Sequence, residues 1–399
     1  MFHNLNKLKI LCVIQRFTPA IGGAENLMKQ YLDYLSLNHE ITVFTSNAIE
    51  LFSFWNKSKE NITIKNDAKY KICRFDVLIP SDVSVNQYSF PYSISSFGPF
   101  CPKMWESLLN LNEKFDLIIA SSFPYDHIVP AFLASQKFNI PFMLLPHIHS
   151  EFLYHNFTAQ KLSILSNADA IVVNTEYEKN QLLQFNILSK NIFINSPGIV
   201  TNFDNSKLFD VRKKYNIDSN SLLLLFAGTK SFDKGAIFLV DALEKLEKNN
   251  LIDVIFIGPE NTEFSNYVSG KPKNIRQHIF NLGSVSDIEK NAIFDACDIF
   301  VMPSKSESFG LVYLEAWLHK KPVIGCKIGS VMNLIDDQKN GILVSFGNIS
   351  ELISALETLQ NPLLRKKLGA DGYQKLSDNF NSEKLCKTFE SICLSLSNH

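Results

Sequence analysis

The sequence lacks several features that would place the chain in a specialised class of protein. It has no CxxC pair, and its seven cysteines are scattered singly along 399 residues, which is typical of reduced core cysteines in a cytosolic protein. No run reaches about 18 apolar residues, so no membrane span is expected. The N-terminus lacks the apolar stretch of a signal peptide. We therefore expect a cytoplasmic protein.

An excess of charge of either sign is also absent. The chain carries 39 Lys and Arg against 40 Asp and Glu, a net charge of −1, and neither half has a basic excess. This balance argues against a nucleic-acid binder. Hydrophobic residues make up 46% and charged residues 20% of the chain, which excludes a disordered protein. At roughly 100–200 residues per domain, the length predicts two domains.

Phenylalanine, by contrast, is abundant, with 32 residues. Two aromatic stretches, at 51–55 and 88–105, follow no regular period. They are compatible with an acceptor loop, with a lip that gives the protein peripheral membrane contact, or with irregular buried packing. The sequence leaves these three interpretations open.

Short β-branched and apolar runs alternate with amphipathic helical patterns along the chain. The runs of the first half lie at 9–14, 41–45, 71–75, 117–121, 142–145, 171–174 and 192–195. Those of the second half lie at 222–227, 254–258, 279–282, 299–302, 323–328 and 342–344. Apolar strands that alternate with helices predict parallel sheets with right-handed crossovers. We expect an α/β protein with two Rossmann-like, doubly wound domains facing a central cleft.

The alternation breaks in a polar stretch at 196–221. We therefore predict an N-terminal domain at 1–200 and a C-terminal domain at 201–380, followed by a helix at 381–399. That helix has one apolar face, formed by Leu385, Phe389, Ile392 and Leu396. Such a face needs an apolar surface to cover, which we expect on the N-terminal domain.

The most informative segment follows the predicted strand at 299–302, where a helix is expected to begin near Ser308–Phe309. Glu307 and Glu315 are eight residues apart, which in one helix corresponds to a rise of roughly 12 Å. The two carboxylates would then reach different parts of one elongated ligand, although two glutamates on a helix are more often solvated surface charges. Backbone N–H groups at the helix start suit a phosphate; they belong to Phe309, Gly310 and Leu311.

This segment resembles the E-x7-E donor-binding motif of the retaining glycosyltransferases of family 4, also called glycosyl transferases group 1. The resemblance extends over nearly the full chain and implies the GT-B fold. It also implies a nucleoside diphosphate sugar, such as a UDP- or GDP-sugar, as donor substrate, with no separate cofactor and no metal. In that family pattern Glu307 holds sugar hydroxyls and Glu315 holds the ribose.

The loop at 226–235, FAGTKSFDKG, resembles the family loop in which an Arg follows the first Gly and a Lys precedes the second. Lys234 matches the lysine, whereas Thr229 occupies the position of the arginine. A diphosphate leaving group needs positive charge aimed at it, so Lys234 is the main candidate. We expect the neighbouring Lys230 to turn inward and compensate; the alternative is a solvated surface lysine.

Two segments of the first domain resemble the rest of the family's site. Gly22 and Gly23 lie in a strand-to-helix loop that resembles the one closing on the donor, although a tight turn would use the same residues. His147 and His149 follow the strand at 142–145, and His149 matches the family's active-site histidine. The alternative interpretation of this histidine pair is half of a metal site. However, no third ligand has a recognisable spacing and no D-x-D occurs in the chain.

The resemblance therefore implies a retaining hexosyltransferase with His149, Glu307 and Lys234 at its catalytic centre. Its acceptor would be a glycan or a lipid- or protein-linked hydroxyl, in bacterial surface polysaccharide, glycolipid or glycoprotein glycan synthesis. A sugar-nucleotide epimerase or phosphorylase on the same fold is one alternative, and an epimerase would isomerise the donor without an acceptor. A non-catalytic glycan-binding partner subunit is another, but it would be expected to have lost some of these residues.

Overall fold

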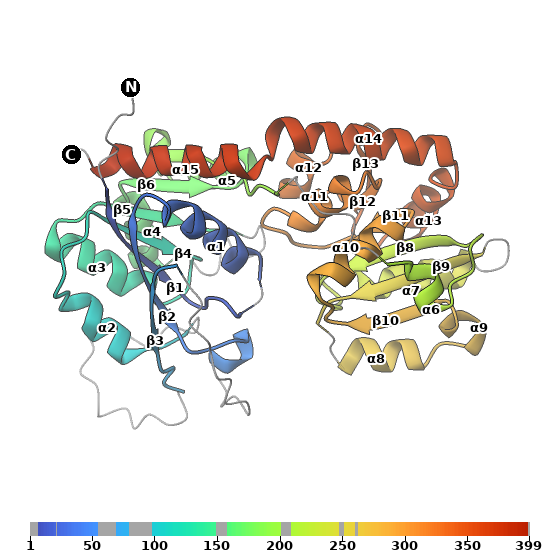
Figure 1. Ribbon diagram of the computed structural model, residues 1–399, viewed down its shortest axis with the longest axis horizontal. Coiled ribbons are helices and arrows are strands. Elements are labelled where there is room, and N and C mark those ends of the chain that lie inside the picture. The colour runs from blue at the N-terminus through green and yellow to red at the C-terminus, as the bar shows by residue number, and fades with distance from the viewer. Residues whose placement is uncertain are drawn as a thin grey trace. The chain divides into compact units, whose positions relative to one another are not determined.

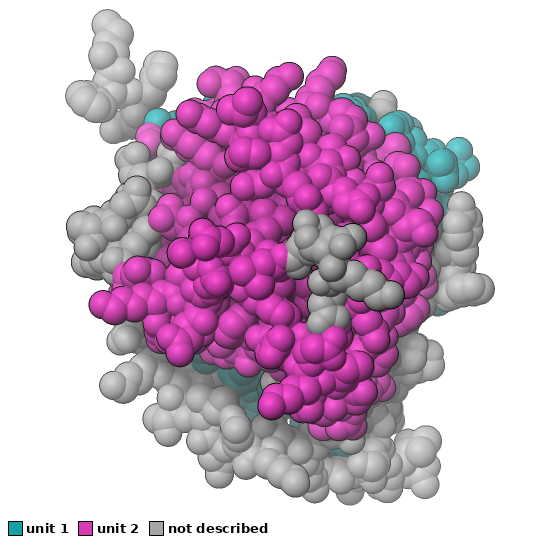
Figure 2. All heavy atoms as spheres, turned by 90° about the vertical axis from the view of Figure 1, so that its right-hand side faces the viewer, with its two compact units in different colours: residues 1–196, 384–399 teal, residues 197–383 magenta. Residues whose placement is uncertain are grey.

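The chain folds into two compact units, each with its own parallel sheet and hydrophobic core. The computed structural model describes residues 7–20, 22–54, 69–79, 98–148, 158–200, 209–246, 251–259 and 262–397. Unit 1 consists of Met1–Ser196 and Lys384–His399, and unit 2 consists of Pro197–Glu383 (Figure 2).

Unit 1 contains a seven-stranded parallel sheet within the described ranges, in the order β3-β2-β1-β4-β5-β6-β7 (Figure 1). Its strands are β1 (Lys9–Ile14), β2 (Glu40–Ser46), β3 (Lys71–Phe75), β4 (Leu117–Ser121), β5 (Phe142–Leu145), β6 (Ala170–Val173) and β7 (Ile192–Ile194). Its helices are α1 (Gly23–Leu35), α2 (Pro102–Leu109), α3 (Ile128–Phe138), α4 (Ala159–Ser166), α5 (Glu176–Leu183) and α15 (Ser382–Ser397). Short 3₁₀ turns lie at Leu51–Phe54 and Ser189–Asn191. The strand order reverses direction between β1 and β4, which defines the switch point where such sheets bind ligands.

Unit 2 contains a six-stranded parallel sheet in its described part, in the order β10-β9-β8-β11-β12-β13. Its strands are β8 (Leu222–Ala227), β9 (Ile252–Ile257), β10 (Ile279–Gly283), β11 (Ile299–Val301), β12 (Val323–Cys326) and β13 (Gly341–Val344). Its helices are α6 (Val211–Tyr215), α7 (Ala236–Leu246), α8 (Thr262–Ser269), α9 (Lys273–Arg276), α10 (Asp287–Ala296), α11 (Leu311–Leu318), α12 (Gly329–Leu334), α13 (Ile349–Thr358) and α14 (Pro362–Asn379). The switch point of this sheet lies between β8 and β11.

Alternate residues of the central strands enter two different cores, which explains the continuous apolar runs. In β1, Leu11 and Val13 face the core shared with α2 and α3, whereas Ile10, Cys12 and Ile14 face the core shared with α1 and α15. A strand covered by helices on both faces has no polar side. The predicted α/β class with two parallel-sheet, Rossmann-like domains is confirmed, and every predicted run overlaps a strand.

The C-terminal helix α15 covers one face of the unit 1 sheet (Figure 1). The rings of Tyr31 and Phe389 stack with their centroids 4.0 Å apart. Beside them, Nε2 of His39 lies 3.1 Å from a carboxylate oxygen of Glu390, and both side chains are nearly inaccessible. The apolar face of this helix therefore belongs to the core of unit 1, although the chain before the helix belongs to unit 2.

The described parts of the aromatic stretches contribute to the core. Phe54, Phe100 and Trp105 are all buried, which favours irregular packing for these parts, whereas Trp55 and residues 80–97 lie outside the described residues. All seven cysteines are free, and six of them are buried. Among the described helices, none combines the length and the apolar character needed to cross a membrane.

Candidate functional site

Two loops of unit 2 meet at its switch point through an ion pair. One loop follows β8 and the other follows β11, and these strands are neighbours in the sheet. Nζ of Lys234 lies 2.6 Å from Oε1 of Glu307 and donates to the carbonyl of Ser306 at 3.1 Å. The hydroxyl of Ser304 donates to the same glutamate oxygen at 2.9 Å. The structure thus brings together two predicted site residues that are 73 positions apart in the chain.

A close backbone approach holds these two loops together. Gly235 has a φ of +79°, and a Cβ at this position would lie 2.4 Å from the carbonyl oxygen of Pro303. Only glycine fits this conformation and this contact. The backbone N–H of Lys305 donates to the carbonyl of Asp233 at 2.7 Å. The glycine that follows Lys234 is therefore required by the packing of one loop on the other.

The prediction that a helix begins at Ser308–Phe309 is wrong. Helix α11 begins after Gly310, which adopts a left-handed conformation with a φ of 95°. A side chain there would strike the ring of Tyr313, because a Cβ would lie 2.6 Å from it. Glu307 therefore belongs to the loop and Glu315 to the helix, so the rise calculated for one continuous helix does not apply.

The start of α11 nevertheless remains a candidate anion site. The first N–H groups of a helix have no partner within it. Leu311 opens the helix and Gly310 precedes it, while the side chain of Phe309 turns into the core against Phe380, with ring centroids 5.7 Å apart. The predicted role of these three N–H groups toward a phosphate stays a prediction.

Glu315 is paired with a lysine that the motif did not reveal. Its Oε1 lies 2.8 Å from Nζ of Lys290 on α10, and both side chains are partly exposed. Burial alone would lower the pKa of Lys290, but the carboxylates of Glu315 and Asp287 together outweigh it and raise that pKa above its ordinary value. Lys290 lies on α10, 25 residues before Glu315, and only the fold brings the two side chains together.

Lys230 is turned inward and fully buried, which excludes the alternative of a solvated surface residue. Its ammonium donates to the side-chain oxygen of Asn281 on β10. In the sheet order, β10 lies on one side of β8, and β11, the strand before the Glu307 loop, lies on the other. The partners of Lys230 and Lys234 therefore lie on opposite sides, and the two lysines extend in different directions from one loop. Thr229, at the position of the family's arginine, is exposed.

In unit 1 the glycine pair lies between the two partners of a buried ion pair, Arg16 and Glu25. Glu25 on α1 is 3% exposed, and its Oε1 lies 2.7 Å from Nη2 of Arg16. A Cβ on Gly22 would lie 2.1 Å from the other oxygen of this carboxylate, whereas Gly23 has nothing within 4 Å of its Cβ position. Gly22 is thus explained by packing alone, and Gly23 is the position with room for a ligand beside the backbone.

His147 uses both of its ring nitrogens within the fold. Nδ1 lies 3.2 Å from the side-chain amide nitrogen of Asn174, and Nε2 lies 3.1 Å from the hydroxyl of Ser121. His147 is therefore held in the structure by its neighbours. His149, the predicted active-site histidine, lies outside the described residues.

Glu178 on α5 is a buried carboxylate that the sequence reasoning missed. Its two oxygens accept backbone N–H bonds from Ile148 at 2.7 Å and from Asn174 at 2.8 Å. Burial raises the pKa of this carboxyl to about 7. A capping-box pattern, Thr175 followed three residues later by Glu178, was the available signal, and the Thr175 hydroxyl does accept the N–H of Glu178 at 3.1 Å.

The raised pKa of Glu178 predicts a pH-dependent contribution to stability. The folded chain binds this proton more tightly than the unfolded chain, so the contribution is present below pH 4.5 and lost as the pH rises to about 7. Relative to a Glu178→Gln variant, the free energy of unfolding of the wild type should fall by about 3 kcal/mol across this window. Denaturant unfolding of both proteins at several pH values measures this difference, and a constant difference would contradict it.

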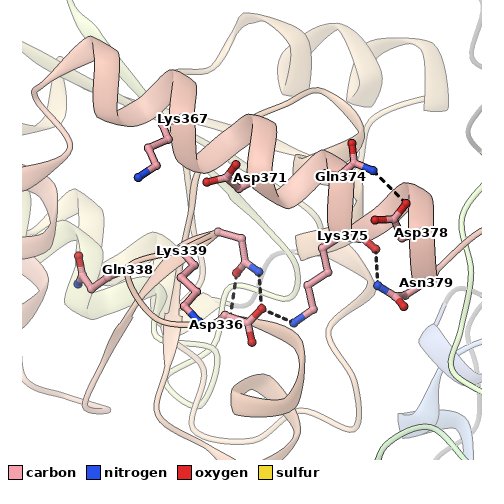
Figure 3. Close-up of a pocket in the computed structure, with 10 residues that line it drawn as sticks. Asp336, Gln338, Lys339, Lys367, Asp371, Gln374, Lys375, Asp378 and Asn379 are labelled. Carbon is pink, nitrogen blue, oxygen red and sulfur yellow. Dashed lines mark hydrogen bonds and ion pairs between the residues drawn. The ribbon is translucent and has the colours of Figure 1, made fainter.

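A further cavity in unit 2 lies away from these residues. It has a volume of about 520 Å³ and lies between α14 and the turn before β13 (Figure 3). Its charges are partly compensated, since Nζ of Lys375 lies 2.8 Å from a carboxylate oxygen of Asp336. None of the predicted site residues lines it. In the described part of the chain, no three His, Cys, Asp or Glu side chains form a metal-binding group.

Comparison with known families identifies the class of protein. The model of the family described as Glycosyltransferase Family 4 matches residues 21–203, and that of Glycosyl transferases group 1 matches residues 209–375. The chain belongs to this family of glycosyltransferases.

Individual relatives cover most of the chain. An uncharacterized glycosyltransferase of Methanocaldococcus jannaschii is 28% identical over 92% of this chain and 93% of its own length. An N-acetyl-alpha-D-glucosaminyl L-malate synthase of Bacillus anthracis is 21% identical over 78% of this chain and 82% of its own. A crystal structure of Anabaena HepE in complex with UDP has a TM-score of 0.74 at 20% identity and covers 97% of this chain and 100% of that one. This last likeness shows that the two proteins share the GT-B fold.

Proposed function

We propose that the protein is a retaining glycosyltransferase that moves a sugar from a nucleoside diphosphate sugar to a hydroxyl acceptor. The observation that carries this proposal is the Lys234–Glu307 pair, 2.6 Å apart, at the switch point between β8 and β11. Ligands of doubly wound sheets bind at this point. A cation beside a carboxylate suits a diphosphate joined to a hydroxyl-rich sugar.

Each residue of unit 2 has a distinct part in donor binding. Lys234 and the N–H groups at the start of α11 bind the diphosphate, Glu307 binds sugar hydroxyls, and Glu315 binds the ribose. In unit 1, His149 binds a sugar hydroxyl near the reacting carbon. A UDP-sugar is the first donor to test, because structures of HepE contain UDP and UDP-glucose.

The proposed reaction depends on electrostatic stabilisation of the leaving group. The bond from the anomeric carbon to the diphosphate oxygen breaks ahead of attack, and the acceptor oxygen then bonds to that carbon from the same face. Configuration is retained because attack comes from the face that the diphosphate leaves. The acceptor proton passes to a diphosphate oxygen, so no separate base is required. Fixed N–H dipoles and Lys234 stabilise the charge that develops on the diphosphate.

The acceptor is proposed to be a glycan or a lipid- or protein-linked hydroxyl, reached in the cytoplasm or at the inner face of the membrane. Incubation of the purified protein with a panel of nucleotide sugars, with and without acceptors, tests the assignment. Retained configuration, read by NMR of the product, supports it. Isomerisation of the donor without an acceptor would instead indicate an epimerase.

Glu315→Ala should raise the donor KM by about 10- to 100-fold with little change in kcat. Ribose contacts are made about equally in the ground and transition states, so losing one weakens binding without slowing the chemical step. Steady-state kinetics over a range of donor concentrations measures both constants. The exposed Glu357 of the same unit supplies the control variant, Glu357→Ala. A large fall in kcat with an unchanged KM would contradict the ribose assignment.

Activity should persist in EDTA. Lys234 and the helix N-terminus supply the positive charge that a divalent cation supplies in metal-dependent transferases. The measurement is the initial rate after dialysis against chelator, with and without added Mg²⁺ or Mn²⁺. Complete loss of activity that either cation restores would show that the proposed charge is insufficient.

A further inference from the structure

We propose that Lys290 is a positioning residue for nucleotide binding: its ammonium holds the Glu315 carboxylate in the orientation that accepts a ribose hydroxyl. The proposal rests on the proposed function, because it takes Glu315 to bind the ribose. It adds a residue of α10 to which the resemblance to family 4 gave no role. Lys290 and Glu315 both belong to unit 2, and Lys290 acts through Glu315 without contacting the nucleotide.

The ion pair uses one oxygen of the carboxylate and leaves the other available. Oε1 of Glu315 lies 2.8 Å from Nζ of Lys290, whereas Oε2 has no hydrogen-bond partner among the residues that the structure describes. The side chains are 26% and 31% exposed, respectively, so the pair is accessible at the surface of unit 2. A carboxylate oxygen accepts a hydroxyl O–H, whereas an ammonium only donates. Glu315 is therefore the member of the pair that suits a ribose hydroxyl, and Lys290 is the member that orients it.

A second pair of side chains fixes α10 against the end of α11. The rings of Phe294 and His319 are inclined by only 13°, with centroids 6.0 Å apart, and Nε2 of His319 lies 3.1 Å from Oδ1 of Asn291. Phe294 follows Lys290 by four positions, and His319 follows Glu315 by four. The ring pair and the ion pair therefore lie one helical turn apart. Packing of the rings sets the spacing at which the ion pair forms.

Lys290 keeps its charge and so can orient the carboxylate at neutral pH. Although burial alone would lower the pKa of Lys290, the carboxylates of Glu315 and Asp287 raise it above its ordinary value. The Asp287 carboxylate lies 3.5 Å away and is 94% exposed, whereas that of Glu315 is closer and less exposed. A carboxylate that is already ordered loses less side-chain freedom when a ligand binds, which is typically equivalent to about a 2- to 10-fold gain in affinity.

Lys290→Met tests this role, because it removes the ammonium and keeps an unbranched apolar side chain. The dissociation constant of UDP, or of GDP if that is the nucleotide bound, should rise by about 3- to 10-fold. The matching 2′,3′-dideoxy nucleotide offers no ribose hydroxyl, so its dissociation constant should change by less than about twofold. Lys290→Arg keeps a cation and should recover most of the wild-type affinity for the ordinary nucleotide. Isothermal titration measures these constants without an acceptor.

A double-mutant cycle separates an action through Glu315 from an independent effect of Lys290. In the Glu315→Ala background the carboxylate is absent, so adding Lys290→Met should change the dissociation constant by less than about twofold. Lys245→Met removes an exposed lysine of α7 in the same unit and is the matched control. It should bind both nucleotides as the wild type does. Thermal unfolding of each variant checks that the fold is intact.

The outcomes distinguish the positioning role from the proposed function. Unchanged binding of the ordinary nucleotide to Lys290→Met would overturn the positioning role. An equal loss for the ordinary and dideoxy nucleotides would also overturn it, because a merely structural effect does not depend on the ribose hydroxyls. So would a further loss on adding Lys290→Met to Glu315→Ala. Absence of binding of any nucleoside diphosphate to the wild type, or equal binding of its dideoxy analogue, would instead overturn the proposed donor site or its ribose contact.

Discussion

Glu307→Ala is expected to lower kcat by at least about 10³-fold while the protein stays folded. The carboxylate lies in a loop, is 11% exposed, and bonds to Lys234 and Ser304 rather than to the hydrophobic core. Its loss removes the proposed contact to the sugar and also the group that orients the Lys234 ammonium. Both effects act where charge develops on the leaving group.

The measurement is single-turnover and steady-state transfer with the donor found in the panel. Glu357→Ala, an exposed carboxylate of the same unit, is the matched control and should behave as the wild type. Thermal unfolding of both variants tests whether the fold is intact. Wild-type turnover in folded Glu307→Ala would remove Glu307 from the catalytic centre.

Lys234→Ala is expected to lower kcat/KM by about 10²- to 10³-fold, since it removes the cation proposed to stabilise the diphosphate. Lys230→Ala should lower the same quantity less, by about tenfold. The ammonium of Lys230 is held by Asn281, and we propose that its charge acts on the diphosphate from within the protein. In this proposal Lys230 supplies the positive charge of the arginine that Thr229 replaces, but it does not contact the diphosphate.

Asn281→Ala separates the charge of Lys230 from its structural bond. This variant removes the side-chain oxygen that holds the ammonium but keeps the ammonium itself. If the charge matters, Asn281→Ala retains more activity than Lys230→Ala at a similar loss of stability. Equal kcat/KM in the two variants would show that Lys230 is structural, and full activity in Lys234→Ala would contradict the assignment of the diphosphate site.

The regular part of the fold was readable from the sequence because it depends on local pattern. The run at 9–14 became β1 with the same bounds, since a strand buried on both faces is apolar throughout. The resemblance to family 4 assigned Lys234 and Glu307 to one donor site, and the structure shows them paired because the loops after the adjacent strands β8 and β11 meet at one edge. The resemblance to family 4 supplied the chemistry that the pattern could not.

Other parts of the site depend on contacts that no local pattern contains. The start of α11 was misplaced because Gly310 adopts a left-handed conformation and a side chain there would clash with the ring of Tyr313. The Lys290–Glu315 pair joins two helices 25 residues apart. Glu178 occupies a capping-box position, yet its carboxylate bonds to Ile148, 30 residues away. Side-chain contacts that depend on tertiary packing cannot be predicted from the spacing of residues along the sequence.

The central claim is that the β8 and β11 loops of unit 2 form a nucleotide-sugar site. Measuring the binding of nucleoside diphosphates to the wild-type protein and to Lys234→Ala tests this claim most directly, because the measurement needs no acceptor. Isothermal titration with UDP and GDP should show one of them binding at a single site to the wild type, with affinity reduced about 10- to 100-fold in Lys234→Ala. Equal affinity in the two proteins, or no binding of either nucleotide, would contradict the claim.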